Sequence, residues 1–404
     1  MEKATKNTHL NHLEDNVFLG GIDGVRDSID FLRAFRDLLQ GKSQRPLNTS
    51  VKWDGAPAIW LGPHPENGKF IVAKKSLFNK KPLYYMSEAG IKNSPDLSPE
   101  LQKKFIIAFN AYKNAGMREL LQGDFLFDNS DLTTSRVDGE EYLTFHPNTI
   151  AYSVPVNSDL AKTIKKAKMG IVFHTTYKGS TIESLSASAG VRLPKAPTNV
   201  WQIDADFKDM SGSASMTKSE TALIDNGMRT LGTHFRQVSR ATMKTLNEPT
   251  IAALCTTYTN AFIRANKTPT PEQAAAGFGP YLQEKFGKEV NKLKTPKGRE
   301  RKQSGFNEIL KPLSRIPGHE LVSVFHLYYG LQKVKNIIIK KLSSAGFIKT
   351  FLKTREGWKV TGHEGYVATD KLGTNSVKLV DRLDFSYANF SDDVIKGWQS
   401  DYRN

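Results

Sequence analysis

The chain has 404 residues, of which 39% are hydrophobic and 24% are charged, proportions that are ordinary for a globular protein. A single cysteine, Cys255, excludes a disulfide framework, and the absence of an apolar run of about 20 residues excludes a membrane-spanning helix. The formal charge of +16, from 57 Lys+Arg against 41 Asp+Glu, favours a polyanionic partner such as nucleic acid, with solubility alone as the alternative. We expect a cytoplasmic protein, because the first residues are polar and predict no secretion signal.

The first half of the chain alternates helical and strand-like patterns. Apolar spacing in GVRDSIDFLRAFRDLLQG predicts a helix that Gly41 ends, and residues 48–85 predict short strands separated by Gly and Pro. A second helix begins at the Ser-Pro pair of SPELQKKFIIAFNAYKNAGMRELLQG, residues 98–123. Three further strand candidates follow, namely DFLFD, EYLTFHPNTIAYSV and KMGIVFHTTYKG. These elements predict an α+β protein built on antiparallel strands.

The pattern changes in the second half of the chain. Residues from about 203 to 350 are mainly helical, and strand-like sequence returns at 357 with GWKVTGHEGYVATD and NSVKLVDRLDFSYANF. We therefore predict a strand-rich core made of residues 1–202 and 351–404, interrupted by a large helical insertion at residues 203–350.

One short stretch, TSVKWDGAPAIWLG at residues 49–62, places a lysine in a strand. Val51 and Trp53 flank Lys52, and Asp54 and Gly55 follow. A partly desolvated lysine with a lowered pKa can act as a nucleophile. The alternative is an edge-strand lysine that precedes a turn aspartate, and the tetrad alone does not decide between the two.

Five elements in order resemble the motifs of the covalent nucleotidyltransferases, which include ATP-dependent DNA ligases, RNA ligases and mRNA-capping guanylyltransferases. The tetrad at Lys52 resembles the adenylated-lysine motif of that superfamily. QGDFLF, GIVFHTTYKG, HEGYVATD and NSVKLVDR resemble the later elements at Asp124, Phe173, Glu364 and Lys378. The resemblance covers residues 50–180 and 357–390. Within it, the segments KWDGAPA, SLFNK and HEGY are similar to those of a ligase subgroup found among large tailed phages.

The resemblance implies an ATP-grasp-like ligase adenylation core that uses ATP and Mg²⁺. Lys52 would attack the α-phosphorus of ATP, and Lys378 would assist by neutralising phosphate charge. Asp124 and Glu364 would hold the metal or the ribose, and Phe173 would stack on adenine. The nucleotide-binding residues implied in this way are Val51, Asp54, Gly55, Lys75, Asp124, Phe173, Glu364 and Lys378.

The sequence also departs from the pattern. Asp124 replaces the usual glutamate, His174 an aspartate, Val380 a second lysine and Pro57 an arginine that is usual in the DNA-ligase branch. We expect the basic run AKKSLFNKK, which contains Lys75, to supply the missing phosphate contact, although it could be a solvated hairpin tip. No segment long enough for a C-terminal OB-fold follows the fifth element, which disfavours a capping enzyme.

The expected function is that of an ATP-dependent polynucleotide ligase. The leading hypothesis is a monomeric DNA ligase that seals 5′-phosphate/3′-hydroxyl nicks in a duplex during DNA repair or replication. An RNA-repair ligase and a catalytically dead nucleic-acid-binding protein are the alternatives.

The helical insertion is the candidate for gripping the substrate, because a basic segment around EKFGKEVNKLKTPKGRERKQSGF is interrupted by Pro296 and Gly298. A solvated, charged surface helix is the alternative. The candidate nucleic-acid-binding residues are Lys292, Lys294, Lys297, Arg299, Arg301 and Lys302.

A second charged motif lies near the N-terminus. His9, His12, Glu14 and Asp15 in HLNHLED have a spacing that could bind a metal ion. Because no cysteine or second histidine pair accompanies them, we expect a capping or packing role instead.

Overall fold

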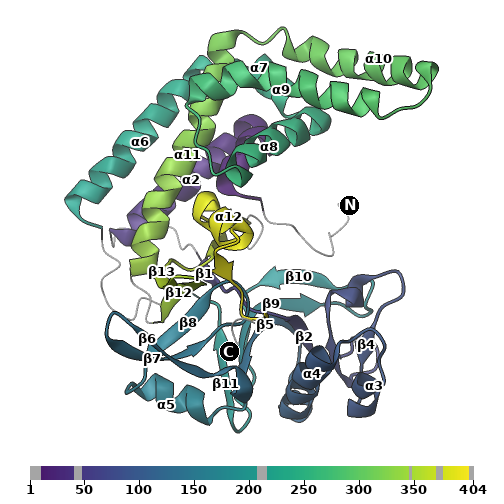
Figure 1. Ribbon diagram of the computed structural model, residues 1–404, viewed down its shortest axis with the longest axis vertical. Helices are drawn as coiled ribbons and strands as arrows, with labels where there is room; N and C mark the ends of the chain where they lie inside the picture. The colour runs from purple at the N-terminus through teal and green to yellow at the C-terminus, as the bar shows by residue number, and fades with distance from the viewer. Residues whose placement is uncertain (1–10, 41–47, 207–215, 345–347, 370–375, 400–404) are drawn as a thin grey trace.

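The computed structural model describes residues 11–40, 48–206, 216–344, 348–369 and 376–399. Figure 1 shows the sheets gathered at one end of the molecule and most of the helices at the other. The protein is α+β and its sheets are largely antiparallel, as the sequence predicted. None of the described helices is both long and apolar enough to cross a membrane.

Seven strands form the central sheet. They are β2 (Ala58–Pro63), β3 (Phe70–Ala73), β4 (Tyr84–Tyr85), β5 (Leu120–Asp128), β9 (Met169–Lys178), β10 (Ser186–Ala189) and β11 (Val200–Asp204). Their order is β10-β9-β5-β2-β3-β4, and β11 pairs in parallel with the start of β9. Alternate residues of β2 face opposite sides, so that Ile59 and Trp60 belong to different apolar clusters. Both faces of the sheet are therefore covered.

Helix α4 (Pro99–Tyr112) packs on one face of this sheet, beside α3 (Glu88–Lys92). Phe105 and Tyr112 of α4 share an apolar cluster with Ile59 of β2 and Phe173 of β9. A short 3-10 helix, Lys75–Phe78, lies on the opposite face, where Leu77 packs with Trp60. Helix α5 (Asp159–Lys166) precedes β9 and packs against β8.

Two smaller sheets combine strands from both sides of the helical segment. The first has the order β13-β12-β8-β7-β6, with β16 paired to β12. Its strands are β6 (Thr133–Val137), β7 (Glu140–Phe145), β8 (Ala151–Pro155), β12 (Lys349–Thr354), β13 (Gly357–Val360) and β16 (Val394–Ile395). The second has the order β1-β14-β15, formed by β1 (Asn48–Lys52), β14 (Gly365–Thr369) and β15 (Ser376–Leu379). We call all three sheets, together with helices α3–α5, the strand body.

The helices between residues 218 and 344 form the helical region. They are α6 (Lys218–Gln237), α7 (Arg240–Leu246), α8 (Pro249–Arg264), α9 (Pro271–Asn291), α10 (Pro296–Leu313) and α11 (Gly318–Ser344). A 3-10 helix (Leu13–Asp15), α1 (Asn16–Leu19) and α2 (Gly21–Leu39) share their hydrophobic core. Residues 13–39, which the sequence grouped with the strand-rich core, thus contribute their apolar side chains to the core of the helical region.

Two predicted elements differ from the structure. The helix expected over 98–123 ends at Tyr112, and residues from Leu120 belong to β5. The stretch 375–390 was expected to be strand-like throughout, but beyond β15 it forms helix α12 (Arg382–Phe390). Asp381 is its N-cap and accepts hydrogen bonds from the backbone amides of Leu383 and Asp384. This capping aspartate was the sequence signal for a helix.

Candidate functional site

Three strands of the smallest sheet bring together residues that are distant in sequence. β1 and β14 pair antiparallel with Lys52 opposite Gly365, so Glu364 lies beside the end of β1. β14 and β15 pair with Val367 opposite Lys378. The Lys52 Nζ atom forms an ion pair with the Glu364 carboxylate. Hence Lys52 and Glu364 of the predicted site are in direct contact.

The turn that follows Lys52 is fixed on the strand body by Asp54. The Asp54 carboxylate accepts hydrogen bonds from Asn148 Nδ2 at 2.8 Å and from the amides of Thr149 and Ile150 at 2.7 and 2.8 Å. The Asp54 amide in turn donates to the Tyr152 hydroxyl at 2.7 Å. Asp54 was expected to bind nucleotide, but its carboxylate is already occupied by these donors. Its role in the structure is to orient the turn.

Gly55 allows this turn to lie against Asp124 of β5. A Cβ atom at position 55 would come within 2.5 Å of the Asp124 Cβ atom. The backbone also docks on β5, because the Ala56 amide donates to the Phe125 carbonyl and the Phe125 amide to the Pro57 carbonyl, each at 3.0 Å. The glycine of the tetrad is therefore required by the close approach between this turn and β5.

The electrostatics link Asp124 and Lys378 to the Lys52–Glu364 pair. Burial raises the pKa of Asp124 to about 7, with further increases from Glu364 and Asp54, while the Lys52 charge lowers it. Burial and the neighbouring carboxylate of Asp54 likewise raise the pKa of Glu364 against the opposing effect of Lys52. Burial and then the charge of Lys52 lower the pKa of Lys378. We call Lys52, Asp124, Glu364 and Lys378 the lysine–carboxylate cluster.

His174 of β9 also belongs beside this cluster, and the sequence reading assigned it no role. Its Nε2 atom lies 3.7 Å from Asp124 Oδ2. Burial, helped by the charge of Lys52, lowers the pKa of His174 to about 4, so the ring is neutral at pH 7. A register shift between β5 and β9 leaves His174 without a Cα partner on β5. Such a bulge has no clear sequence signal here, although histidine at this place was already a departure from the motif.

Phe173 does not fit its predicted role. Its side chain is fully buried in the apolar cluster between α4 and the seven-stranded sheet. The centroid of its ring lies 5.6 Å from that of Tyr112 in an edge-to-face contact. Gly123 lies opposite it on β5. No face of the ring is open for a base, so Phe173 is a core residue. The aromatic motif was read correctly as strand but assigned to the wrong face.

Two other predicted nucleotide contacts lie apart from the cluster or are already bonded. The Val51 amide donates to the Ala205 carbonyl at 2.7 Å, and its half-buried side chain packs on two apolar clusters. Lys75 is exposed on the 3-10 helix, and no contact in the described ranges joins it to the lysine–carboxylate cluster.

The predicted metal ligands, Asp124 and Glu364, fit a shared rather than a dedicated metal site. Among the residues that the structure describes, no group of three or more His, Cys, Asp and Glu side chains is placed to hold a metal ion. Mg²⁺ is commonly bound by one or two carboxylates together with substrate phosphates and water. Two carboxylates beside a lysine suit that arrangement.

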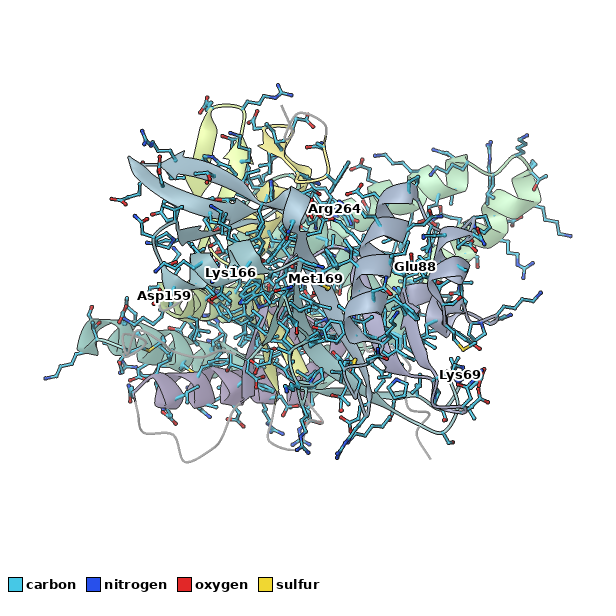
Figure 2. The ribbon with its side chains drawn as sticks, turned by 90° about the horizontal axis from the view of Figure 1, so that it is seen from below. Lys69, Glu88, Asp159, Lys166, Met169 and Arg264 are labelled. Atoms are coloured by element: carbon cyan, nitrogen blue, oxygen red, sulfur yellow. The ribbon has the colours of Figure 1, made fainter. Side chains whose placement is uncertain are left out.

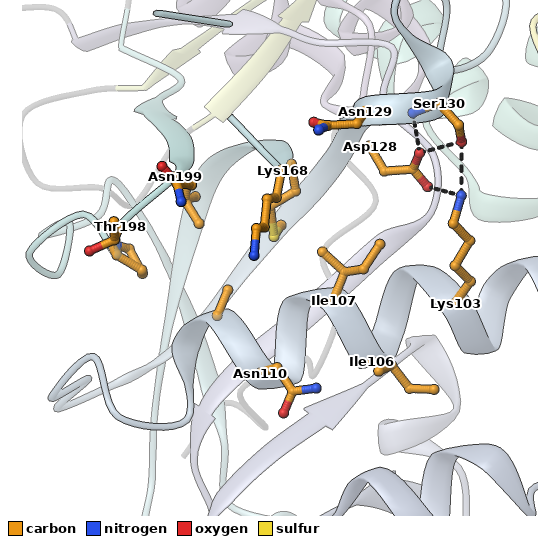
Figure 3. Close-up of a pocket in the computed structure, with 14 residues that line it drawn as sticks. Lys103, Ile106, Ile107, Asn110, Asp128, Asn129, Ser130, Lys168, Thr198 and Asn199 are labelled. Atoms are coloured by element: carbon orange, nitrogen blue, oxygen red, sulfur yellow. Dashed lines mark hydrogen bonds and ion pairs between the residues drawn. The ribbon is translucent and has the colours of Figure 1, made fainter. Parts of the chain in front are cut away.

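Two pockets lie at different distances from this chemistry. One of about 320 Å³ has Asp54, His363 and Glu364 in its wall and therefore adjoins the cluster. A larger one, of about 750 Å³, lies between α4 and the start of β9, where Lys103, Asp128 and Ser130 form a bonded network (Figure 3). No residue of the lysine–carboxylate cluster lines the larger pocket.

The predicted nucleic-acid-binding residues lie on an exposed hairpin formed by α9 and α10 (Figure 1). The helix is interrupted earlier than predicted, because α9 ends at Asn291, whereas Pro296 and Gly298 lie in the first turn of α10. Stacked rings of Phe286 and Phe306, 3.9 Å apart, hold the two helices together. The side chains of Lys292, Lys294, Lys297, Arg299, Arg301 and Lys302 are all exposed.

Two of these cations are already bonded within the hairpin. Lys302 Nζ lies 3.2 Å from Glu289 Oε2, and Arg299 Nε donates to the Leu293 carbonyl at 2.8 Å. For Lys292, Lys294, Lys297 and Arg301, the structure shows no ion pair or hydrogen bond of the side chain within the described residues.

The N-terminal motif has the expected packing role. Glu14 accepts two hydrogen bonds of 2.8 Å from Lys335 Nζ of α11, and Asp15 accepts one of 2.8 Å from Arg382 of α12. These side chains are buried, and His9 lies outside the described residues. The two partners, Lys335 and Arg382, are more than 300 residues away in the chain, so no local sequence pattern indicated them.

Taken together, these features define an α+β protein with a lysine–carboxylate cluster between a three-stranded sheet and a seven-stranded sheet. The chain belongs to a family of unknown function, DUF6267, whose model matches residues 7–393. No curated protein and no solved structure matches the chain.

Proposed function

We propose that this protein is an ATP-dependent polynucleotide ligase that forms a covalent nucleotidyl intermediate on Lys52. One observation carries the proposal. Lys52, Asp124, Glu364 and Lys378 were selected from sequence by the order of their motifs, and the fold brings these four residues of separate segments into one cluster. A lysine at the edge of a sheet, paired with a solvated carboxylate, would not require two further charged residues to converge on it.

The residues of the cluster can carry the first step. The Lys52 amine attacks the α-phosphorus of ATP, an N–P bond forms, and the P–O bond to pyrophosphate breaks. Glu364, which is bonded to the Lys52 ammonium, accepts the proton that makes the amine nucleophilic. Lys378 stabilises negative charge on the phosphate. Mg²⁺, held by Asp124 and Glu364 when bound, would supply further charge stabilisation.

Nucleotidyl transfer to a nucleic acid end completes the proposed reaction. The AMP group moves from Lys52 to a 5′-phosphate, and a 3′-hydroxyl then displaces AMP as the phosphodiester bond forms. The lysine is regenerated as a free amine. We take DNA as the substrate, with RNA strands as the alternative that the substrate series below distinguishes.

The exposed α9–α10 hairpin supports a polyanionic substrate. Four of its cations have no partner in the described part of the chain, so binding phosphates would not require them to break existing contacts. Each phosphate contact contributes about 0.9 to the slope of log affinity against log salt concentration. Replacing Lys294, Lys297 and Arg301 with alanine should therefore flatten this slope by up to about 3 for a nicked duplex.

The matched control removes the same charge from the strand body. Lys165, Lys166 and Lys168 are exposed at the end of α5 and beyond it, and Figure 2 shows Lys166 on the side of the molecule that carries the sheets. The triple alanine variant of these three should keep the slope of the unaltered protein. Equal slopes for both triple variants would show that the hairpin is only a solvated surface.

The test of the reaction is incubation with α-labelled ATP and Mg²⁺, followed by denaturing gel electrophoresis. We expect the protein to retain the label, Lys52→Ala to lose it, and Lys69→Ala, a change at an exposed lysine of the strand body, to keep it. Nicked DNA and nicked RNA duplexes then distinguish the substrates. A protein that binds the nicked duplex but never acquires label would be the non-catalytic binding protein instead.

A further inference from the structure

The pocket beside Glu364 is built where three parts of the chain meet. The end of α11 contributes Lys340 and Ser343, α12 contributes Asp384 and Phe385, and the connection from β13 to β14 contributes Gly362 and His363. Its volume of about 320 Å³ is at the small end of the range for ligand-binding pockets, which is roughly 300–1,000 Å³. Because Glu364 is part of the wall, a ligand here would be a neighbour of Lys52.

One polar atom in this pocket has no partner. His363 lines it, and the Nδ1 atom of His363 is buried without a hydrogen bond in the described structure. Buried polar atoms are nearly always bonded, so an unpaired one indicates a missing partner. In contrast, the carboxylates of Asp54 and Asp381 in the same wall already accept hydrogen bonds, from residues 148–150 and from Asn336. A ligand in this pocket that hydrogen-bonds to imidazole would supply the partner that His363 Nδ1 lacks.

The charge of the wall argues against phosphate. It contains the four carboxylates of Asp54, Glu364, Asp381 and Asp384, against the single cation of Lys340. An anionic group would be repelled, whereas hydroxyl and amino groups could donate to the carboxylate of Asp384, which accepts no hydrogen bond in the described residues. Ribose hydroxyls and the exocyclic amine of a base have this chemistry.

The pocket wall also contains an aromatic ring that a base could stack on, whereas the ring of Phe173 is fully buried. Phe385 is half-buried in the pocket wall and makes no contact with another aromatic ring in the described ranges. The rest of the apolar wall is formed by Ile150, Ile339, Val360 and Ala388. A base needs such a flat apolar face, because stacking on aromatic side chains contributes much of its binding.

We propose that this pocket holds the nucleoside part of the nucleotide whose phosphates meet Lys52, with the base against Phe385 and a hydrogen bond to His363 Nδ1. This assignment rests on the proposed function for its phosphate end only. It replaces the expected stacking on Phe173 and makes α11 and α12 part of the nucleotide site. The helical region would then sense whether nucleotide is bound.

The experiment measures binding of three probes, adenosine, ATP and inorganic tripolyphosphate, to the full chain by titration calorimetry. Phe385→Ala should weaken adenosine and ATP binding about tenfold, which corresponds to about 1.4 kcal/mol. It should leave tripolyphosphate binding unchanged, since the phosphates lie at the lysines. Phe390→Ala is the matched control, because Phe390 is on the same helix, is 70% exposed and does not line the pocket.

A second variant avoids removing a side chain from the wall. Ser344 is exposed at the end of α11, and Ser344→Trp should narrow the pocket and weaken adenosine binding by a similar factor. Unaltered adenosine binding in both variants, or no adenosine binding by the unaltered protein, would overturn the inference. Normal labelling of Lys52 in that case would leave the proposed function standing. Weakened adenosine binding in the variants, without any labelling of Lys52 in the unaltered protein, would support the nucleoside pocket and overturn the proposed function.

Discussion

Two clusters of charged side chains lie next to β15, and they differ in how completely their charges are compensated. In the first, Glu14, Asp15, Lys335 and Arg382 are buried and every charge has a bonded partner of opposite sign. Burial alone would raise the pKa of Glu14, but Lys335 and Arg382 together lower it, whereas burial still raises the pKa of Asp15 to about 6 against the charge of Arg382. This cluster is the pattern of a structural ion-pair network.

The lysine–carboxylate cluster is the other pattern. Among the described residues its only ion pair is Lys52–Glu364, and Asp124, whose side chain is 18% exposed, has no cation in hydrogen-bonding contact. The pKa of Asp124 is raised to about 7, and that of Lys378 is lowered, both mainly by burial. Burial of charge without full compensation costs stability, and it is this feature that makes the cluster a candidate for a functional site. The contrast teaches that incomplete pairing, rather than charge density, distinguishes the site.

The largest effect should come from breaking the paired cluster. Glu14→Gln leaves the Lys335 ammonium buried without its countercharge, and removing one partner of a buried pair costs about 3–5 kcal/mol. We expect a decrease of that size in the free energy of unfolding, measured by urea denaturation. Lys335→Met should cost a similar amount.

The double variant provides the control for this prediction. Glu14→Gln combined with Lys335→Met removes both charges and should recover at least half of the loss, because no uncompensated charge remains. Costs that simply add would show that the two residues stabilise the fold independently of their ion pair.

In the lysine–carboxylate cluster, replacing Asp124 with asparagine should have the opposite effect and increase the free energy of unfolding at neutral and higher pH. The folded-state pKa of about 7 lies above the ordinary value of about 3.9, so the native protein binds this proton more tightly than the unfolded chain does. The stabilising effect of this proton is therefore present below about pH 4 and is lost as the pH rises through 7. Asp124→Asn, which cannot ionise, should be more stable at pH 8 by about 1–3 kcal/mol.

This pH dependence is measured in metal-free buffer by urea denaturation at several pH values. The two proteins should have similar stability near pH 4 and diverge as the pH rises. The same variant should label more slowly with ATP, as expected when a destabilising residue serves function. A variant that is less stable than the unaltered protein at pH 8 would show that the Asp124 carboxylate stabilises the fold.

Much of the site was accessible from sequence because its residues follow strand motifs in a fixed order. The α+β class and the position of Lys52 beside Glu364 needed only local patterns and the resemblance. Predicting the face of the sheet on which Phe173 lies would have required the strand register. The register shift between β5 and β9 decides which side chain points toward Asp124. A strand pattern that is apolar on both sides does not reveal that choice.

The tertiary partners of charged residues were also beyond the sequence. Lys335 occurs in a lysine-rich helix that reads as surface, yet it is fully buried because Glu14, 321 residues away, accepts its hydrogen bonds. Helix α2 similarly joins α6–α11 through long-range packing that no local pattern encodes. The pocket formed by α11, α12 and residues 360–364 depends on the same long-range arrangement.

The smallest effect should be that of Glu364→Gln, which is chemically the same substitution as Glu14→Gln and therefore tests the comparison directly. The Lys52 side chain is 31% exposed, so water and salt screen its attraction to Glu364. Losing that attraction is also offset, because a neutral amide costs less to bury than a carboxylate whose pKa is raised by burial. We expect the free energy of unfolding at pH 7 to change by less than about 1 kcal/mol. Labelling from ATP should nevertheless slow markedly, because the proton acceptor for Lys52 is gone. Urea denaturation and the rate of label incorporation measure the two quantities on the same sample. A loss of stability as large as that of Glu14→Gln would place the Lys52–Glu364 pair among the structural ion pairs and remove the ground for treating the cluster as an active site.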